Sequence, residues 1–214
     1  MHHQAVSHSR IITEFRSKYY LHYIGFGYHR EQETETTAGD MAVKIELKPV
    51  KEEDAADLYD LFQSMPLNEN GAANSSYGLS ETEFSAWLKK QEDASKGIGL
   101  KEGWVPATLY VLWIDDIPVA RSSLRHWLTP ALEQQGGHIG FSVGPKFRGN
   151  CYSNILLAET LKKAKAMNIE RVLITNHDDN EPAWKCVEHN GGLLVKKAPD
   201  PADGHTLRYY QITL

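Results

Sequence analysis

A strand, a turn and a long helix follow one another between residues 136 and 167, and this succession limits the fold more than any other feature. Residues 138–143 are a predicted strand, and residues 152–167 carry a helical apolar stripe of Leu157, Leu161 and Ala164. The turn leaves N–H groups unpaired at the helix start, where the positive end of the helix dipole favours anions. With Arg148, Gly149 and Ser153, the turn is either a phosphate cradle or an ordinary loop.

Regular periodicity runs from Met41 to the end of the chain. Strands are predicted at residues 43–47, 108–114, 117–127, 138–143, 171–175, 193–197 and 207–214. Helices are predicted at 52–65, from the capping box Ser80–Glu83 onward, at 152–167 and at about 181–189, with a loop at 66–78. This order predicts an α+β fold with a mixed sheet, in one domain over residues 41–214.

The first forty residues differ in character from the rest. They contain five of the ten histidines, show no sustained period and end in a polar Glu/Thr run. They are either a poorly ordered extension, with Met41 as the working start, or an arm that docks residues 11–28 onto the domain. His2, His3 and His8 are conceivable metal ligands, but scattered tail histidines are usually solvated, so no metal site is predicted.

The composition argues against several classes of protein. A net charge of -5 and a pI near 6.1 lack the basic field of nucleic-acid-binding proteins. Two cysteines, Cys151 and Cys186, without zinc-site spacing indicate neither a disulfide framework nor a structural zinc. No apolar run approaches the roughly 20 residues of a membrane span. We expect a cytoplasmic protein that binds neither nucleic acid nor membrane; a homodimer is one assembly that the sequence allows.

Residues 136–192 resemble the acetyl-CoA core of the GNAT superfamily, the Gcn5-related N-acetyltransferases. The run Arg148–Ser153 (RGNCYS) lies over the family's Gln/Arg-x-x-Gly-x-Gly/Ala loop, and Asn180–Ala183 with Asn190–Gly191 lies over its second motif. The element order extends the likeness to residues 41–214, and Arg125–His126 with Asn-Gly-Gly is similar to a group of predicted bacterial acetyltransferases. The resemblance implies an acyltransferase that uses acetyl-CoA and has a mostly antiparallel central sheet flanked by helices.

The resemblance also implies where acetyl-CoA binds. Main-chain groups of Phe141, Ser142 and Val143 would pair with the pantetheine arm, and Asn180 would hydrogen-bond to it from the other side. The pyrophosphate would accept hydrogen bonds from the main chain of the loop residues Arg148, Gly149, Asn150, Cys151, Tyr152 and Ser153. An amine would attack the thioester carbon directly, with a strand N–H near Val143 stabilising the oxyanion.

Two loop residues depart from the family motif. Ser153 stands where the family has Gly or Ala, which is a mild change, and Cys151 stands at the central glycine. A cysteine adds Cβ and sulfur beside the pyrophosphate path, and a positive φ there would cost about 1 kcal/mol or more. Cys151 therefore predicts weakened cofactor affinity.

The sequence leaves the catalytic groups open. Many relatives place an acidic Tyr seven residues after the motif Asn, but that position is Val187 here, and Tyr152 is a weaker candidate. His126, Glu133 and His138 are the candidate bases, because they lie on or between central strands where substrate enters in relatives. Each also has a structural alternative. His126 would be a hydrogen-bonded structural histidine, Glu133 a solvated charge in a loop, and His138 a residue that starts a strand.

Two functions remain open at this level. The favoured one is N-acetylation of a small amine or an exposed amino group; the other is a non-catalytic acyl-CoA-binding or interaction module that has kept the fold. The acceptor is not identified, because the helix pair and the loop at 66–78 build its pocket. Covalent catalysis by Cys151 fits the loop poorly, and Cys186 is predicted to be a core residue.

Overall fold

The computed structural model describes residues 43–200 and 202–214. Its elements, in chain order, are β1 (Ile45–Pro49), η1 (Glu52–Asp54), α2 (Ala55–Ser64), β2 (Asn68–Glu69), β3 (Ala72–Ala73), α3 (Glu81–Ser95), β4 (Ala107–Ile114), β5 (Ile117–Arg125), α4 (Pro130–Gln134), β6 (Ile139–Val143), η2 (Pro145–Phe147), α5 (Tyr152–Ala166), β7 (Arg171–His177), α6 (Glu181–His189), β8 (Leu193–Pro199) and β9 (Thr206–Thr213). None of the helices in these two ranges has the length and apolar content that a bilayer crossing requires. The extension expected over residues 1–40, with its histidines, lies outside the described residues.

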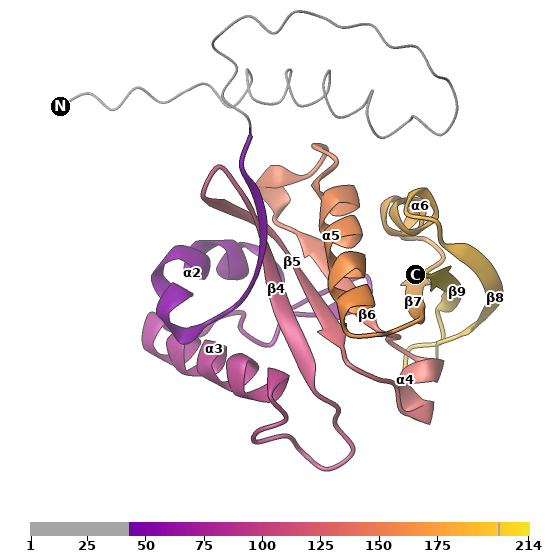
Figure 1. Cartoon of the computed structure of the whole chain (residues 1–214), viewed down its shortest axis with the longest axis horizontal. Helices are drawn as coiled ribbons and strands as arrows, with labels where there is room; N and C mark the ends of the chain where they lie inside the picture. Colours follow the sequence, from indigo (N-terminus) through magenta and orange to yellow (C-terminus); the bar gives the residue numbers. More distant parts are fainter. Residues whose placement is uncertain (1–42, 201) are drawn as a thin grey trace, which may run out of the picture. The chain divides into compact units, whose positions relative to one another are not determined.

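The strands form a four-stranded sheet in the order β1-β4-β5-β6 and a three-stranded sheet in the order β7-β9-β8. All described strand pairs are antiparallel, which confirms the expected mostly antiparallel sheet. Residues 108–114 of β4 are all buried, so both faces of the first sheet are covered. Figure 1 shows α2 and α3 on one side of this sheet and α5 on the other.

The predicted order of strands and helices is confirmed, and η2, the hairpin β2–β3 and α4 are additions to it. The segment predicted as a loop at 66–78 contains the hairpin β2–β3, whose tip residues Asn70 and Gly71 both have positive φ, as a two-residue hairpin turn requires. The connection after β5 contains α4, capped by Thr129, which accepts a hydrogen bond from the Leu132 N–H. The hairpin and α4 are both too short for a hydrophobic period to reveal them.

Helix α5 packs across both sheets. Its stripe residues Leu157, Leu161 and Ala164 are buried, as their spacing predicted. They belong to one apolar cluster with residues of β5, β6, β7 and β9, among them Leu124, Ile139, Val172, Ile174 and Ile212. The two sheets therefore share one core although their strands do not form one continuous ladder.

The two sheets meet at a joint between residues 137–138 and Leu173. The His138 N–H donates to the Leu173 carbonyl at 2.7 Å, and the Leu173 N–H donates to His138 Nδ1 at 3.0 Å. Beyond this joint, within the described residues, no hydrogen bond connects Ile139–Val143 with β7. The sheet that the sequence predicted as one is thus divided, and β6 keeps an open main-chain edge.

The joint depends on Gly137. A Cβ at this position would lie 2.4 Å from the Leu173 carbonyl oxygen, and φ is +60°. We expect Gly137→Ala to lower the free energy of unfolding by about 2 kcal/mol or more, because it adds both a clash and backbone strain. The matched control is Gly140→Ala, whose Cβ would meet nothing within 4 Å and should not lower that free energy. Urea unfolding followed by circular dichroism checks this; equal losses in the two variants would contradict it.

Candidate functional site

A cleft of about 850 Å³ lies where β6 and β7 separate. Its lining includes Phe141, Ser142 and Val143 of β6, the loop before α5, and Asn180 at the start of α6. Of the ten residues predicted to bind the cofactor, all but Asn150 line it. The fold therefore brings together the three sequence segments that the family resemblance singled out.

The main chain of β6 is open on its cleft side. Hydrogen bonds to β5 alternate along an antiparallel strand. The Gly144 N–H donates to the Val119 carbonyl at 3.0 Å, so in this register Ser142 also pairs with β5. Phe141 and Val143 therefore turn their N–H and C=O groups toward the open edge. The Val143 carbonyl already accepts a hydrogen bond from Arg148 Nε at 3.3 Å. Both main-chain groups of Phe141 and the N–H of Val143 can therefore pair with an extended ligand.

The loop before α5 has donors and space for an anion. Within the described residues, the main-chain N–H groups of Gly149, Asn150, Cys151 and Ser153 donate no hydrogen bond to the protein. A Cβ at Gly149 would meet nothing within 4 Å, so the space beside it is open. Asn150 does not line the cleft; its Nδ2 holds the loop by donating to the Phe147 carbonyl at 3.0 Å. Free donors at a helix N-terminus fit a pyrophosphate group.

Cys151 adopts the left-handed conformation that the motif glycine would adopt without strain. Its φ and ψ are 59° and 12°, and it is the residue that precedes α5. The side chain is exposed. The backbone strain that the sequence predicted for a positive φ is thus present, at a cost of about 1 kcal/mol.

We expect Cys151→Gly to raise the free energy of unfolding by a few tenths to about 1 kcal/mol, because relief of the left-handed strain is partly offset by greater unfolded-state entropy. Acetyl-CoA should bind several-fold more tightly, because Cβ and sulfur no longer crowd the loop. Cys151→Ser is the matched control, since it keeps Cβ and therefore the strain. Urea unfolding and isothermal titration with acetyl-CoA measure the two effects. If glycine and serine gave the same affinity, crowding by Cys151 would be refuted.

Arg148 is paired with Glu69 of the hairpin β2–β3. The distances are 3.0 Å from Nη1 to Oε1 and 2.6 Å from Nη2 to Oε2. Both side chains are partly exposed, so the pair contributes at most about 1 kcal/mol. A phosphate group would compete with the carboxylate for the same two-pronged guanidinium.

Two asparagines in the cleft have unused hydrogen-bonding groups. Asn176, near the end of β7, has a buried Oδ1 without a partner in the described part of the chain. The Asn180 side chain makes no capping hydrogen bond to α6. Buried polar atoms without partners are uncommon, so Asn176 is suited to accept a hydrogen bond from a bound N–H group. Asn176 was not among the residues predicted from the sequence, although its place after the apolar run of β7 could have indicated a polar residue at the edge of the sheet.

The three candidate bases are not among the residues that line the cleft. His126 Nε2 is hydrogen-bonded to Thr108 Oγ1 at 2.9 Å, and burial lowers the pKa of His126. Glu133 is exposed on α4. His138 is held in the joint with Leu173, and burial, with the nearby positive charge of Arg125, lowers its pKa. The structure gives each residue the surroundings of its structural alternative, and a role as base remains a prediction for all three.

Tyr152, the weaker acid candidate, is buried, and so are Val187 and Cys186. Tyr152 lines the cleft, and burial raises the pKa of its hydroxyl. Val187, at the position of the family's acidic Tyr, is fully buried. Burial raises the pKa of the Cys186 thiol to about 12, so it stays protonated in the core, as the sequence predicted.

The lowered pKa of His138 gives stability a pH dependence. Because the folded chain binds a proton on His138 less readily than the unfolded chain, its contribution is present above the unfolded pKa of about 6.5 and is lost as pH falls below it. We expect the free energy of unfolding to fall between about pH 7 and about pH 5. The variant His138→Asn keeps a hydrogen-bond acceptor but does not titrate, so its free energy of unfolding should fall less over that pH range. Urea unfolding at several pH values measures this difference. If the free energy of unfolding fell equally with pH in both proteins, the prediction would be contradicted.

Comparison with known proteins gives one family match. A family model described as the acetyltransferase (GNAT) family matches residues 75–191 of this chain. A comparison with curated proteins gave no match.

Solved structures of acetyltransferases are similar in fold. A ribosomal L7/L12 alpha-N-protein acetyltransferase in complex with coenzyme A, RimL, is 17% identical with a TM-score of 0.61, over 79% of this chain and 94% of that one. The ribosomal-protein-S5-alanine acetyltransferase from Vibrio fischeri is 15% identical with a TM-score of 0.61, over 79% and 92%. An enzyme from Salmonella typhimurium, which modifies the N-terminal serine of ribosomal protein L7/L12, is 17% identical with a TM-score of 0.56, over 79% and 95%.

Proposed function

Because the chain belongs to the GNAT family of acetyltransferases, whose model matches residues 75–191, we propose that it transfers the acetyl group of acetyl-CoA to an amine. The observation that carries this proposal is the loop before α5 beside a cleft that has the open edge of β6 on its wall. Within the described residues, the main-chain N–H groups of Gly149, Asn150, Cys151 and Ser153 in this loop donate no hydrogen bond to the protein. The cosubstrate supplies an acetyl thioester, which an amine can attack without a covalent enzyme intermediate.

Each part of the cleft has a role in this proposal. The N–H groups of the loop bind the pyrophosphate, and Arg148 exchanges Glu69 for a phosphate oxygen. Phe141 and Val143 hold the pantetheine arm through their main chain, as an added strand would be held. A main-chain N–H of this strand stabilises negative charge that develops on the carbonyl oxygen. Asn180 binds the arm from the opposite wall.

The acceptor is proposed to enter beside Arg121, whose side chain lines the cleft. Its Nη2 donates to the Ala73 carbonyl at 3.0 Å, which leaves other guanidinium donors for a ligand. Burial lowers the Arg121 pKa to about 10, so it remains a cation at neutral pH. A carbonyl or carboxylate oxygen of the acceptor would complement it. Peptide N-termini carry such oxygens next to the amino group, and two of the similar structures are described as enzymes that act on the alpha-amino group or the N-terminal serine of ribosomal protein L7/L12.

Deprotonation of the amine needs a base. His126, Glu133 and His138 stay the predicted candidates, and because none of them lines the cleft, a proton would reach them only through water. Replacement of each by alanine or glutamine, with the pH profile of kcat/KM as readout, would assign the group.

The test of the proposed function is an acceptor screen with acetyl-CoA. Small amines and peptides that begin with serine, alanine or other residues are incubated with the full chain, and released CoA is detected with a thiol reagent. Transfer is confirmed by the mass of the acetylated product. Acetyl-CoA binding without transfer to any acceptor would favour the non-catalytic module instead, and absence of binding at millimolar concentration would overturn both functions.

On the best acceptor, Arg148→Gln should raise KM for acetyl-CoA about tenfold and change kcat by less than about twofold, because Arg148 contacts the phosphate region and not the reacting atoms. Arg171→Gln is the matched control, since Arg171 is exposed at the start of β7 and does not line the cleft. Steady-state kinetics with varied acetyl-CoA measure both. Equal KM values in the two variants would contradict the role of Arg148.

A further inference from the structure

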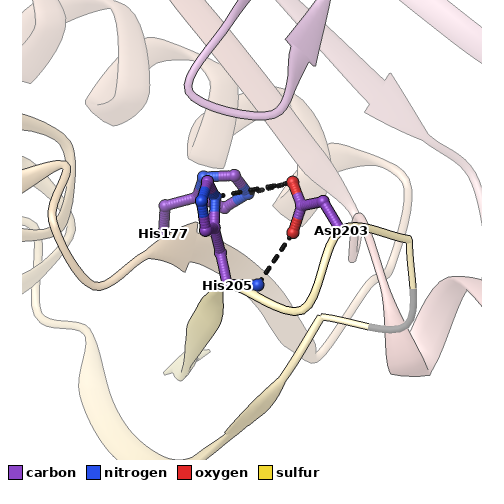
Figure 2. Close-up of side chains that lie close together, drawn as sticks. All are labelled: His177, Asp203 and His205. Carbon is purple, nitrogen blue, oxygen red and sulfur yellow. Dashed lines mark hydrogen bonds and ion pairs between the residues drawn. The ribbon is translucent and has the colours of Figure 1, made fainter.

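Four polar side chains gather at the end of β7. His177 is the last residue of β7, and Asp200, Asp203 and His205 belong to the connection between β8 and β9. Figure 2 shows His177, Asp203 and His205 turned toward one another. The proposed acetyl transfer assigns no role to this group.

The spacing of these atoms is that of ligands around one ion. Asp200 Oδ2 and Asp203 Oδ2 lie 3.5 Å and 3.8 Å from His177 Nε2, and His205 Nδ1 lies 3.5 Å from Asp203 Oδ2. These separations are longer than an ordinary hydrogen bond. Metal–ligand bonds of about 2.0–2.1 Å put the corners of a tetrahedron about 3.3–3.4 Å apart. The ligand atoms of His177, Asp203 and His205 all lie within 4.8 Å of one another.

The two carboxylates are held in place by their other oxygen. Asp200 Oδ1 accepts a hydrogen bond from the Ala202 N–H at 2.8 Å, and Asp203 Oδ1 accepts one from the His205 N–H at 2.9 Å. Each carboxylate therefore keeps its Oδ2 for the group around His177. The connection is closed further by the Asp200 N–H, which donates to the His205 carbonyl at 2.6 Å.

The local charge calls for a cation. Asp200 and His177 are buried, with exposed fractions of 4% and 5%. In the described ranges, the ion pairs of Asp200 and Asp203 are with histidines and not with lysine or arginine. A buried carboxylate is costly unless a cation or hydrogen bonds compensate it. A protonated imidazole can offset one of these charges, whereas a divalent ion offsets both.

Gly71 leaves room for such an ion. A Cβ at this position, at the tip of the hairpin β2–β3, would lie 2.8 Å from His177 Nε2 and 3.2 Å from its Cε1. Any other residue would therefore fill the space beside the nitrogen that faces the two carboxylates.

We propose that His177, Asp203 and His205 bind one divalent transition-metal ion of the zinc type, with Asp200 as the neighbouring carboxylate. Two imidazole nitrogens and a carboxylate oxygen suit Zn²⁺, Co²⁺ or Ni²⁺ better than Mg²⁺ or Ca²⁺, which prefer oxygen ligands alone. The ion ties the β8–β9 connection to β7. Because His177 and Asp200 also line the cleft, it borders the space in which acceptor and cosubstrate are proposed to meet. The inference goes beyond acetyl transfer and does not depend on it.

The test is Zn²⁺ binding by the full chain, measured by isothermal titration and by metal analysis after dialysis, without acetyl-CoA. His2, His3 and His8 are first replaced by alanine, so that terminal histidines do not contribute. In this background we expect one tightly bound equivalent, a rise in the thermal midpoint with Zn²⁺, and weaker binding in acidic buffer, because protons compete with the metal for its ligands. Co²⁺, whose visible absorption reports coordination geometry, serves as a second probe.

In the same background, Asp203→Asn and His205→Ala should each weaken Zn²⁺ binding at least tenfold. Both side chains are partly exposed, so these variants are expected to fold. His189→Ala on α6 is the matched control and should keep the full affinity. Unchanged binding in the Asp203 and His205 variants, or no bound equivalent in the background, would overturn the site. Acetyl-CoA titration of the same variants separates this outcome from failure of the proposed function.

Discussion

The contact between His138 and Leu173 is the interaction on which the functional architecture depends. It joins two antiparallel sheets at one point, and the shared core under α5 holds them there. Beyond the contact β6 and β7 do not pair, so a strand edge that would otherwise be used inside a sheet stays open to a ligand. The same geometry explains why Gly137 has no side chain and why burial lowers the pKa of His138. His138, which the sequence offers as a candidate base, is in this chain part of the joint with Leu173.

The loop at Cys151 and the cluster at His177 are two parts of the cleft lining with polar groups that a ligand could satisfy. At the loop, four main-chain donors have no partner within the described residues and Cys151 has left-handed geometry, so ligand binding is opposed by strain and favoured by unsatisfied hydrogen bonds. At the cluster, carboxylates converge on a buried imidazole, and within the described residues they form no ion pair with a lysine or arginine. The hairpin β2–β3 lies beside both the loop and the cluster. Glu69 pairs with Arg148 of the loop, and Gly71 lies next to the His177 ring. Changes in the hairpin are therefore expected to affect both.

Much of the fold was predictable because it is encoded locally. The stripe of α5, the capping box at Ser80 and the strand segments of β4 and β5 each lie within about fifteen residues, and all are confirmed. Of the site, the loop and strand residues were predictable because their segments follow one another along the chain and resemble a family motif. The candidate bases were chosen from their order in the sequence. Whether a side chain on a strand faces a cleft, a joint or a hydrogen-bond partner depends on residues far away in sequence, and His126 and His138 illustrate this.

The sequence by itself determined the element order, the family, the cosubstrate and the position of the loop in which Cys151 replaces the motif glycine. These features depend on short runs of neighbouring residues. Only the tertiary structure decided that the sheet divides after His138 and that Phe141 and Val143, rather than Ser142, face the open edge. It alone brought Asn176 Oδ1 into the cleft without a partner among the described residues, and His177 next to Asp203 and His205. These features depend on strand pairing and on contacts between residues far apart in the sequence. A local sequence pattern does not show which distant segments will come into contact.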